Sequence, residues 1–284
     1  MAVEQRVAVV TDSTSYLPEG VAERLGIRVV PLQVGLGTRS GLEGSEISPA
    51  DVTAVLRERG QVTTSRPTPA EFISTYKAAL ESGAESVVSV HLSAQLSGTC
   101  DSARLAAEEF APGKVVVVDS RATAMALGFA VMASADAAAH GADADTVARA
   151  ATECIDRSSA LFYVDSLEWL HRGGRIGTAA AMLGTALAVK PLMHLVDGRI
   201  MPMEKVRTSS KAIARLVQIA VNAAGDEQVD IAVQHLASPD RAADIARQLQ
   251  DAIPNLNELH FSEVGAVVGA HVGPGLLGIV VRRR

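Results

Sequence analysis

The feature that most constrains the fold is an alternation, through the first half of the chain, of short β-branched runs with helical stretches. The runs are nearly continuous in Val and Ile, which is typical of strands buried on both faces of a parallel sheet. Strands are predicted at Arg6–Thr11, Ile27–Val34, Ser86–His91 and Lys114–Val118. Helices are predicted at Tyr16–Leu25, Pro49–Arg59, Pro69–Glu81, Ser97–Phe110 and Ala122–His140. This pattern predicts a parallel sheet covered by helices on both faces.

The pattern changes near Ser158, after a helix predicted at Asp145–Asp156. Asp197-Gly198 lies between two apolar runs and is a strong signal for a hairpin, so the second half is expected to be mixed rather than all parallel. Strands are predicted at Leu161–Val164, Leu192–Val196, Ile200–Val206, Asp230–Gln234 and Glu258–Ser262, with helices at Lys211–Ala224 and Asp240–Ala252. We therefore expect an α/β protein of two domains, residues 1–157 and residues 158–284.

Composition narrows the functional class. The net charge is −6 and charges of both signs are mixed along the chain, whereas nucleic-acid binding usually requires a basic face. Two cysteines are too few for a disulfide framework, and the first six residues lack the apolar core of a signal peptide. These observations predict a cytoplasmic protein with no nucleic-acid partner.

Three segments lack Asp, Glu, Lys and Arg: Ala122–Ala135, Ile176–Val189 and Val264–Val281. The first two are shorter than the roughly 20 residues that a membrane-spanning helix needs, and they are typical of buried helices. The third segment contains residues that would break a helix, which favours a strand and a glycine-rich loop. They are Gly265, Gly269, Gly273, Pro274, Gly275 and Gly278. We expect no stable membrane insertion.

Common catalytic motifs are missing or out of context. The run from Gly273 to Gly278 matches the spacing of a dinucleotide fingerprint, but only six residues follow it, too few for the helix that this motif requires. The chain contains no phosphate loop, no Gly-x-Ser-x-Gly elbow and no His-Glu-x-x-His helix. We therefore predict no catalytic group, no metal site and no cofactor.

Hydroxyl side chains and one histidine are the best candidates for polar contacts with a ligand. Thr64 and Ser65 precede a rigid turn with two prolines, and Ser97-Gly98-Thr99 opens a predicted helix, where exposed N–H groups favour an anion. Asp12 ends the first strand and His271 lies in a glycine-rich frame. For Asp12, Ser13, Ser97 and Thr99, helix capping and ligand contact both remain open from these residues alone. The same holds for His271, since a solitary histidine is often structural.

A second group of candidates is basic. Arg172 and Arg175 flank Gly173-Gly174 near Trp169, and Arg207 follows the predicted hairpin. Exposed arginines are commonly solvated surface, but clustered arginines beside glycine and tryptophan also suit a surface that docks a partner protein.

Several motifs occur in a specific order along nearly the whole chain. They are Val9-Val10-Thr11-Asp12-Ser13-Thr14; Thr64-Ser65-Arg66-Pro67-Thr68-Pro69; Leu96-Ser97-Gly98-Thr99; Val117-Val118-Asp119-Ser120; Leu170-His171-Arg172-Gly173-Gly174-Arg175-Ile176; Lys190-Pro191 with Asp197-Gly198; Val206-Arg207-Thr208; and His271-Val272-Gly273-Pro274-Gly275. With these motifs the chain resembles the DegV family, bacterial proteins that bind a fatty acid. The family often has Gln and Ser where this chain has Arg66 and Thr68, and an aromatic residue at the place of Cys100.

The resemblance implies a parallel α/β/α domain followed by a two-layer mixed domain, with an acyl chain in a tunnel between them. It further implies that the carboxylate is held by Thr64 or Ser65, by Ser97 with Gly98 and Thr99, and by His271. Family members present the fatty acid to a separate, ATP-binding fatty acid kinase, and the basic docking region of the family corresponds to Arg172, Arg175 and Arg207. Residues Ala179–Leu187 are expected to line the tunnel, although core packing explains their composition equally well.

The resulting hypothesis is a carrier of a long-chain fatty acid that is not itself an enzyme and delivers its cargo to a kinase. One alternative is an enzyme for a small carbonyl compound or a phosphometabolite that uses His271 and Asp12. A third is a lipid-responsive interaction protein without a kinase partner.

Overall fold

The computed structural model describes residues 6–181 and 190–284 and groups the chain into two compact units. The first unit consists of Met1–Gln33 and Ser65–Asp156, and the second of Val34–Thr64 and Arg157–Arg284. The predicted domains divide the chain at one point, whereas the units divide it at three, because residues 34–64 group with the C-terminal half. The chain passes from one unit to the other between Thr64 and Ser65, inside the predicted head-group motif Thr64-Ser65-Arg66-Pro67.

The first unit contains a four-stranded, all-parallel sheet in the order β2-β1-β6-β7. The strands are β1 (Val7–Asp12), β2 (Arg28–Val30), β6 (Ser86–His91) and β7 (Val115–Asp119). The predicted parallel sheet is therefore confirmed. The predicted strand Ile27–Val34 is too long: β2 ends at Val30 because Pro31 has no N–H for the ladder. A separate strand, β3 (Gln33–Leu36), begins after a gap of two residues.

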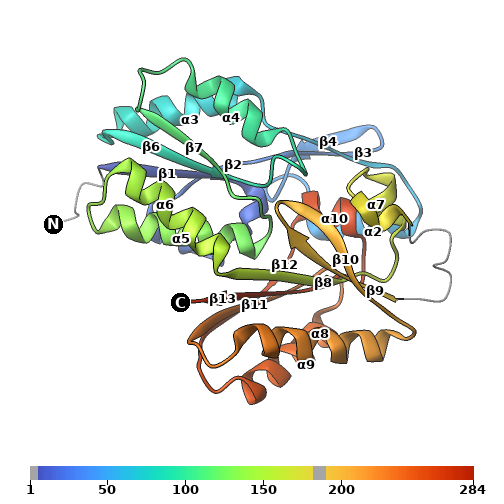
Figure 1. Ribbon diagram of the computed structural model, residues 1–284. Coiled ribbons are helices and arrows are strands. Elements are labelled where there is room, and N and C mark those ends of the chain that lie inside the picture. Colours follow the sequence, from blue (N-terminus) through green and yellow to red (C-terminus); the bar gives the residue numbers. More distant parts are fainter. Residues whose placement is uncertain (1–5, 182–189) are drawn as a thin grey trace. The chain divides into compact units, whose positions relative to one another are not determined.

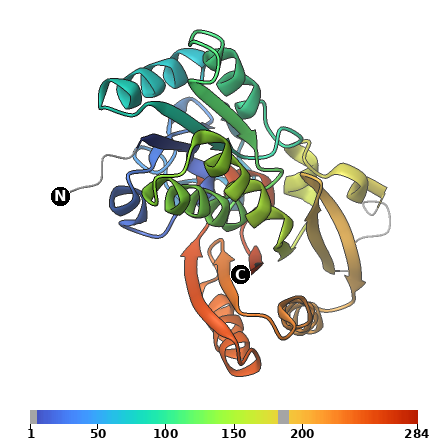
Figure 2. The same ribbon diagram turned by 60° about the vertical axis from the view of Figure 1, so that its left-hand side comes forward.

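Helices cover both faces of this sheet (Figures 1 and 2). On one face Phe72 and Tyr76 of α3 (Pro69–Glu81) and Ala103 of α4 (Thr99–Ala107) pack on β1 and β6. On the other face α5 (Met125–Ala139) contacts β1, and α6 (Ala144–Asp156) contacts β6 and β7. The start of α3 is fixed locally, because Thr68 and Glu71 form a capping box and Pro69 occupies the first helical position.

The predicted helix Tyr16–Leu25 is largely wrong. The chain forms a 3-10 turn at Ser13–Ser15, and only α1 (Val21–Leu25) is α-helical. Tyr16 has a left-handed backbone with φ of 43°, which ends the turn, and Pro18 follows before the helix can start.

The second unit contains a six-stranded mixed sheet in the order β10-β9-β8-β13-β11-β12. Its strands are β8 (Ser158–Tyr163), β9 (Lys190–Val196), β10 (Arg199–Val206), β11 (Val229–His235), β12 (Leu256–Glu263) and β13 (Leu277–Arg283). β11 pairs with β12 in parallel and with β13 antiparallel, as the predicted mixed character requires. The predicted hairpin is confirmed at Asp197-Gly198, where both residues have positive φ.

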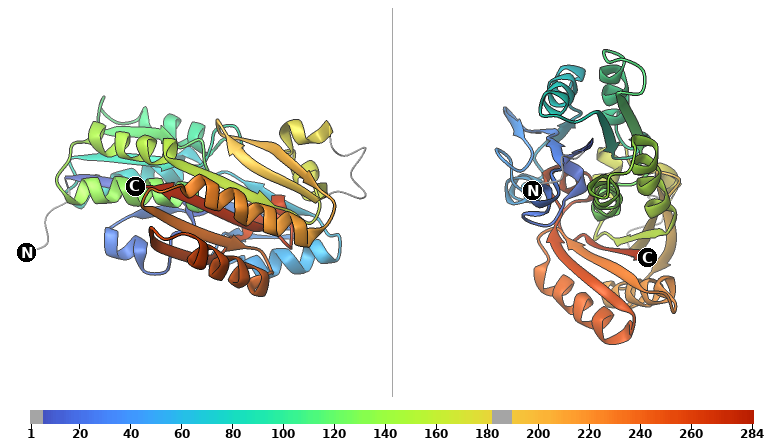
Figure 3. Two further views of the ribbon diagram at one scale, coloured as in Figure 1. Left: turned by 60° about the horizontal axis from the view of Figure 1, so that its bottom comes forward. Right: turned by 90° about the vertical axis from the view of Figure 1, so that its left-hand side faces the viewer.

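One face of the six-stranded sheet is covered by α8 (Ser209–Ala224) and α9 (Pro239–Ala252), which lie side by side (Figure 3). Leu216 of α8 and Ile245 and Leu249 of α9 are fully buried with Ile231 and Ile279 of the sheet. The second unit also contains a three-stranded sheet in the order β4-β3-β5, with β4 at Arg39–Leu42 and β5 at Val62–Ser65. The helices α2 (Pro49–Arg57), α7 (Glu168–Arg172) and α10 (Ala266–Val272) also belong to this unit.

Helix α10 corrects a prediction, since the sequence favoured a strand and a glycine-rich loop over Val264–Val281. Only β13 and the turn before it fit that description. Helix α10 forms despite Gly269 because Glu43 accepts a hydrogen bond from the Val267 N–H at 2.7 Å, and because Gly269 allows close packing on Leu236 and Val52. Residues 182–189, which include most of the predicted tunnel-lining segment, lie outside the described residues.

Candidate functional site

Helix α10 places His271 in its last turn, where the side chain meets strand β5. The hydroxyl oxygen of Thr64 lies 2.8 Å from Nε2 of His271, although 207 residues separate the two in sequence. Both residues belong to the second unit. The segment 34–64 therefore holds α10 at both ends, through Glu43 at its N-terminus and Thr64 at its C-terminus. The contact joins two of the predicted site residues.

The surroundings of His271 keep its imidazole neutral. Burial, with a smaller contribution from the Arg175 cation, lowers the pKa of His271 from 6.5 to about 4. Nδ1 is buried and has no hydrogen-bond partner among the described residues. Gly173 packs directly against this nitrogen, since a Cβ at position 173 would overlap it. At neutral pH the ring can therefore orient a ligand or a hydroxyl, but it is a poor general acid.

The glycines after His271 are required by their neighbours. Gly273 has φ of +73°, and a Cβ there would overlap the indole of Trp169. Gly275 has φ of +91°, and a Cβ there would overlap the carboxylate of Asp165. At both positions the left-handed backbone makes any other residue costly, and at Gly273 the close packing on Trp169 adds to that cost. These glycines build the turn between α10 and β13 and are not a dinucleotide-binding loop.

In the first unit, Ser97, Gly98 and Thr99 form the start of α4. Gly98 is the N-cap residue and has no side chain with which to cap the helix. The Ser97 hydroxyl oxygen lies 2.9 Å from the hydroxyl oxygen of Thr99 and accepts a hydrogen bond from the Thr99 N–H at 3.3 Å. Thr99 is fully buried and Ser97 is partly exposed. Ser97 thus presents a hydroxyl group at the N-terminus of α4, whereas Thr99 holds that hydroxyl in place.

Arg66 lies against this helix start. Its guanidinium donates a long hydrogen bond of 3.4 Å to the Gly98 carbonyl, and a Cβ at position 98 would overlap it. Gly98 is therefore needed for this contact. Ser65, the remaining predicted hydroxyl, is exposed at the end of β5.

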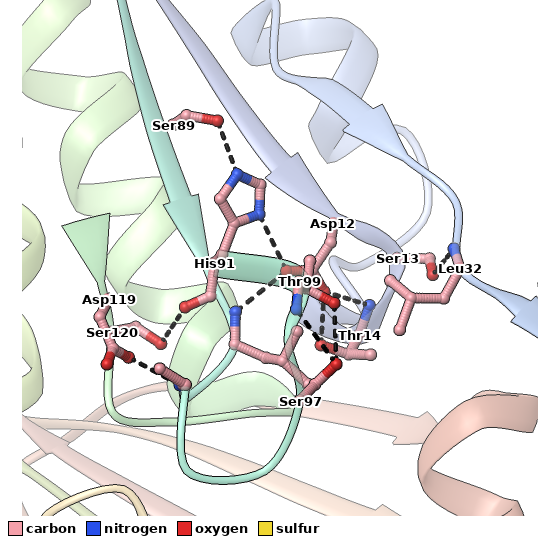
Figure 4. A network of polar contacts seen from close by, with 12 residues as sticks. Asp12, Ser13, Thr14, Leu32, Ser89, His91, Ser97, Thr99, Asp119 and Ser120 are labelled. Atoms are coloured by element: carbon pink, nitrogen blue, oxygen red, sulfur yellow. Dashed lines mark hydrogen bonds and ion pairs between the residues drawn. The ribbon is translucent and has the colours of Figure 1, made fainter. Parts of the chain in front are cut away.

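Asp12 belongs to a buried network that the sequence did not predict (Figure 4). One carboxylate oxygen accepts from the Thr14 N–H at 3.0 Å and the Thr14 hydroxyl at 2.6 Å; the other accepts from the Leu92 N–H at 2.9 Å and faces Nδ1 of His91 at 3.0 Å. The side chains of Asp12 and His91 are both 0% exposed. Asp12 caps the 3-10 turn, not the predicted helix, and its saturated carboxylate has no access to a substrate.

The network continues through the sheet to α3. Nε2 of His91 lies 2.6 Å from the Ser89 hydroxyl, which accepts from the Tyr76 hydroxyl at 2.8 Å. Ser89 is fully buried, as is Tyr76, so this row of Asp, His and Ser cannot act on a substrate as a catalytic triad. A structural role explains every contact, and the enzyme alternative loses Asp12.

Two carboxylates fasten the loop that carries Ser97. Asp12 accepts from the N–H of Leu92, and Asp119 accepts from the N–H of Ala94 at 3.2 Å and of Arg121 at 2.9 Å. Asp12 and Asp119 end β1 and β7, so the carboxyl ends of two strands position the loop after β6 (Figure 4).

The predicted basic residues all lie in the second unit. Arg172 ends α7, stacks over the Trp169 ring at 5.3 Å and pairs with Glu168 at 3.5 Å. Arg175 donates to the Gly173 carbonyl at 2.6 Å, and Arg207 is exposed just after β10. The loop after Arg175 approaches β10, since Gly177 packs against the Ile200 carbonyl.

Comparison with known proteins identifies the family. The DegV family model, described as "Uncharacterised protein, DegV family", matches residues 6–284. The chain belongs to the DegV family. It is 56% identical to a DegV domain-containing protein of Streptomyces coelicolor over 282 residues, which cover 99% of this chain and 100% of the relative. A DegV domain-containing protein of Mycobacterium tuberculosis is 41% identical over 279 residues, 97% of this chain and 96% of that one.

Solved structures of other DegV proteins share the fold. A fatty-acid-binding DegV family protein from Thermus thermophilus has a TM-score of 0.93 and 35% identity, with 98% of this chain and 100% of that chain covered. DegV of Bacillus subtilis, a fatty-acid-binding protein, has a TM-score of 0.89 and 33% identity, with coverage of 98% and 99%. The predicted family and the predicted fold of two α/β domains are thus confirmed.

Two further observations concern the described residues alone. None of their helices combines the length and the apolar character needed to cross a lipid bilayer. No three His, Cys, Asp or Glu side chains in this part of the chain come together as ligands for a metal ion.

Proposed function

We propose that this protein binds a long-chain fatty acid and presents its carboxylate to a partner fatty acid kinase for acyl phosphate formation. The observation that carries the proposal is the contact between Thr64 and His271, which joins two motifs 207 residues apart in sequence. Solved relatives named as fatty-acid-binding proteins, at 35% and 33% identity, support the choice of ligand.

The polar groups suit a carboxylate that must remain reactive. Thr64 and Ser97 offer hydroxyl donors, and the depressed pKa keeps His271 neutral. Hydroxyl donors orient a carboxylate without the full ion pair that would stabilise it as a poor nucleophile toward phosphorus. Ser65 and Gly98 are proposed as further ligand contacts, and Thr99 is proposed to act on the ligand through Ser97.

The acyl chain supplies the affinity in this proposal. Burial is worth roughly 0.8 kcal/mol per methylene, so a chain of about 14 to 16 methylenes contributes on the order of 11 to 13 kcal/mol before the costs of binding. The tunnel between the domains stays a prediction, as does its lining by residues 179–187. A cytoplasmic location is likewise proposed, not tested.

We assign the chemistry to the partner rather than to this chain. Asp12 is buried and saturated, and neutral His271 is a poor acid, so neither group favours catalysis by the chain alone. Arg172, Arg175 and Arg207 are proposed as the docking surface for the kinase. Incubation of the pure protein with ATP and a fatty acid should give no acyl phosphate; turnover without a partner would contradict the assignment.

Native mass spectrometry of the freshly purified protein tests the ligand class, followed by organic extraction and mass analysis. We expect one long-chain fatty acid per chain. A mass equal to that of the chain alone, unchanged after incubation with a panel of fatty acids, would refute fatty-acid binding.

Thr64→Val tests the head-group site, because valine keeps the shape of threonine and removes the hydroxyl. Loss of a hydrogen bond to a charged group costs about 1.5–3 kcal/mol, so fatty-acid affinity should fall roughly tenfold to a hundredfold. Thr63→Val is the matched control, since successive residues of β5 point to opposite faces. Equal losses in the two variants would remove Thr64 from the site.

Arg207→Glu tests docking in a reconstituted reaction with the kinase. We expect phosphorylation to fall while fatty-acid binding is unchanged, because Arg207 is exposed and lies apart from the proposed hydroxyl contacts of the head group in sequence. Arg247→Glu, on the exposed side of α9, controls for net charge. An unchanged phosphorylation rate would exclude Arg207 from the docking surface.

A further inference from the structure

The imidazole of His271 presents an asymmetry that fixes the position of its proton. Nε2 faces the Thr64 hydroxyl at 2.8 Å, while Nδ1 is buried and without a hydrogen-bond partner among the described residues. A neutral imidazole carries one proton, so one of these nitrogens is the donor and the other the acceptor. The two tautomers give Thr64 opposite roles: either its hydroxyl donates to the ring, or it accepts from the ring.

The packing of Gly173 decides between them. A Cβ on Gly173 would overlap Nδ1 and lie 3.0 Å from Cε1 and 3.2 Å from Cγ, the two ring atoms beside it. A Cβ at the same distance from Nδ1 but above the ring face would lie closer to both Cε1 and Cγ than it does. The Cα–Cβ direction of Gly173 therefore meets Nδ1 from outside the ring, close to the ring plane. In glycine a hydrogen occupies that direction. The Cα–H bond of Gly173 therefore points at the place where an Nδ1 proton or lone pair would lie.

A lone pair fits this place and a proton does not. An Nδ1–H would collide with the Gly173 hydrogen and would remain a buried donor without an acceptor, a rare and costly arrangement. A lone pair forms a weak C–H···N contact instead. Arg175 fastens the same loop by donating to the Gly173 carbonyl at 2.6 Å.

We propose that His271 carries its proton on Nε2 and donates it to the Thr64 hydroxyl oxygen, so that the Thr64 proton is left for the ligand. Gly173 is the positioning residue that sets this polarity. The relay runs from His271 through Thr64 to the head group, and it favours a head group that accepts strongly, an ionised carboxylate over the alcohol of the same chain length. The preference rests on the proposed function, whereas the position of the ring proton does not.

The position of the proton is tested first, on the full chain at neutral pH. Long-range ¹H–¹⁵N correlation on protein labelled at histidine nitrogens distinguishes a protonated from an unprotonated ring nitrogen, and the spectrum of His271→Gln assigns the signals. We expect a protonated Nε2 and an unprotonated Nδ1 for His271. The opposite tautomer, or an even mixture, overturns the proposal whether or not any lipid binds.

Gly173→Ala then tests the relay. Residue 173 has φ of −76°, so alanine adds no backbone strain, and its methyl group displaces the ring from Thr64. We expect affinity for hexadecanoic acid to fall roughly tenfold to a hundredfold, and affinity for hexadecanol to fall less than tenfold. Gly278→Ala is the control, because the nearest heavy atom to its Cβ would be 3.8 Å away.

The outcomes separate the relay from the proposed function. Equal losses for acid and alcohol, or none for the acid, would overturn the role of Gly173 while fatty-acid binding stands. If the unmodified protein binds neither lipid, the proposed function and the head-group preference both fail, and the tautomer experiment still decides where the ring proton lies. A urea unfolding midpoint for Gly173→Ala shows whether a loss of affinity is a loss of folding.

Discussion

Asp12→Asn separates a structural from a catalytic carboxylate, because it replaces one oxygen by an NH₂ group of the same shape. In the fold, Asp12 accepts from the Thr14 N–H, the Thr14 hydroxyl and the Leu92 N–H, and it faces His91 Nδ1 at 3.0 Å. Nδ1 carries the proton toward this carboxylate, since Nε2 is then free to accept from Ser89, which in turn accepts from Tyr76. All four contacts of Asp12 therefore need an acceptor.

Asparagine keeps only one accepting oxygen, so two of the four buried donors lose their partner. Each buried donor left unpaired costs about 1–3 kcal/mol, which predicts a loss of roughly 2–6 kcal/mol. A typical domain has only about 5–15 kcal/mol of stability, so the change should be large. When the NH₂ group takes the place of the oxygen that faces Leu92, the loop before Ser97 should also loosen, because that oxygen accepts the Leu92 N–H.

Urea unfolding followed by far-ultraviolet circular dichroism gives the stability, and hydrogen exchange of the β1 and β6 peptides locates the effect. Asp101→Asn is the matched control: Asp101 forms an exposed pair with Arg104 at 3.2 Å, worth about 0–1 kcal/mol. Wild-type stability and wild-type protection of β1 and β6 in Asp12→Asn would refute the assigned network.

Two further predictions concern the second unit. Gly273→Ala should lower the free energy of unfolding by roughly 2–5 kcal/mol, because the methyl group meets Trp169 and the backbone has φ of +73°. Fluorescence of Trp169, the only tryptophan in the sequence, follows unfolding in urea. A change below about 0.5 kcal/mol, the range of ordinary surface substitutions, would contradict the packing. The folded pKa of His271, about 4, lies below the unfolded value of 6.5, so stability should be full above pH 6.5 and decline as the pH falls toward 4. Urea midpoints between pH 7 and pH 4 should decline less steeply in His271→Gln, and identical slopes would show that His271 does not titrate in this way.

Much of the secondary structure was predictable because its causes are local. Thr68, Pro69 and Glu71 fix the start of α3 within four residues, and Asp197-Gly198 fixes a hairpin with its two positive φ values. The predicted strands Ser86–His91 and Lys114–Val118 are confirmed to within one residue at each end. Such signals need no knowledge of the rest of the chain.

Helix α10 was not predictable in the same way. Gly269 lowers the intrinsic preference for a helix, and the compensating contacts come from Glu43, Val52 and Leu236, none of them near in sequence. The motif Arg172-Gly173-Gly174-Arg175 suggested only a docking surface, and nothing in the sequence indicated that Gly173 itself has a role. Its packing on His271 appears only in the folded chain.

The sequence by itself determined the family, the two α/β domains and the candidate residues of the head-group site, because motif order and local periodicity survive in a linear chain. The tertiary structure decided what those residues do. It buried and saturated Asp12, gave His271 a hydroxyl partner on one side and Gly173 on the other, and left Ser97 partly exposed at a helix start. Burial, hydrogen-bond partners and pKa depend on neighbours that are distant in sequence, and only folding brings those neighbours into contact.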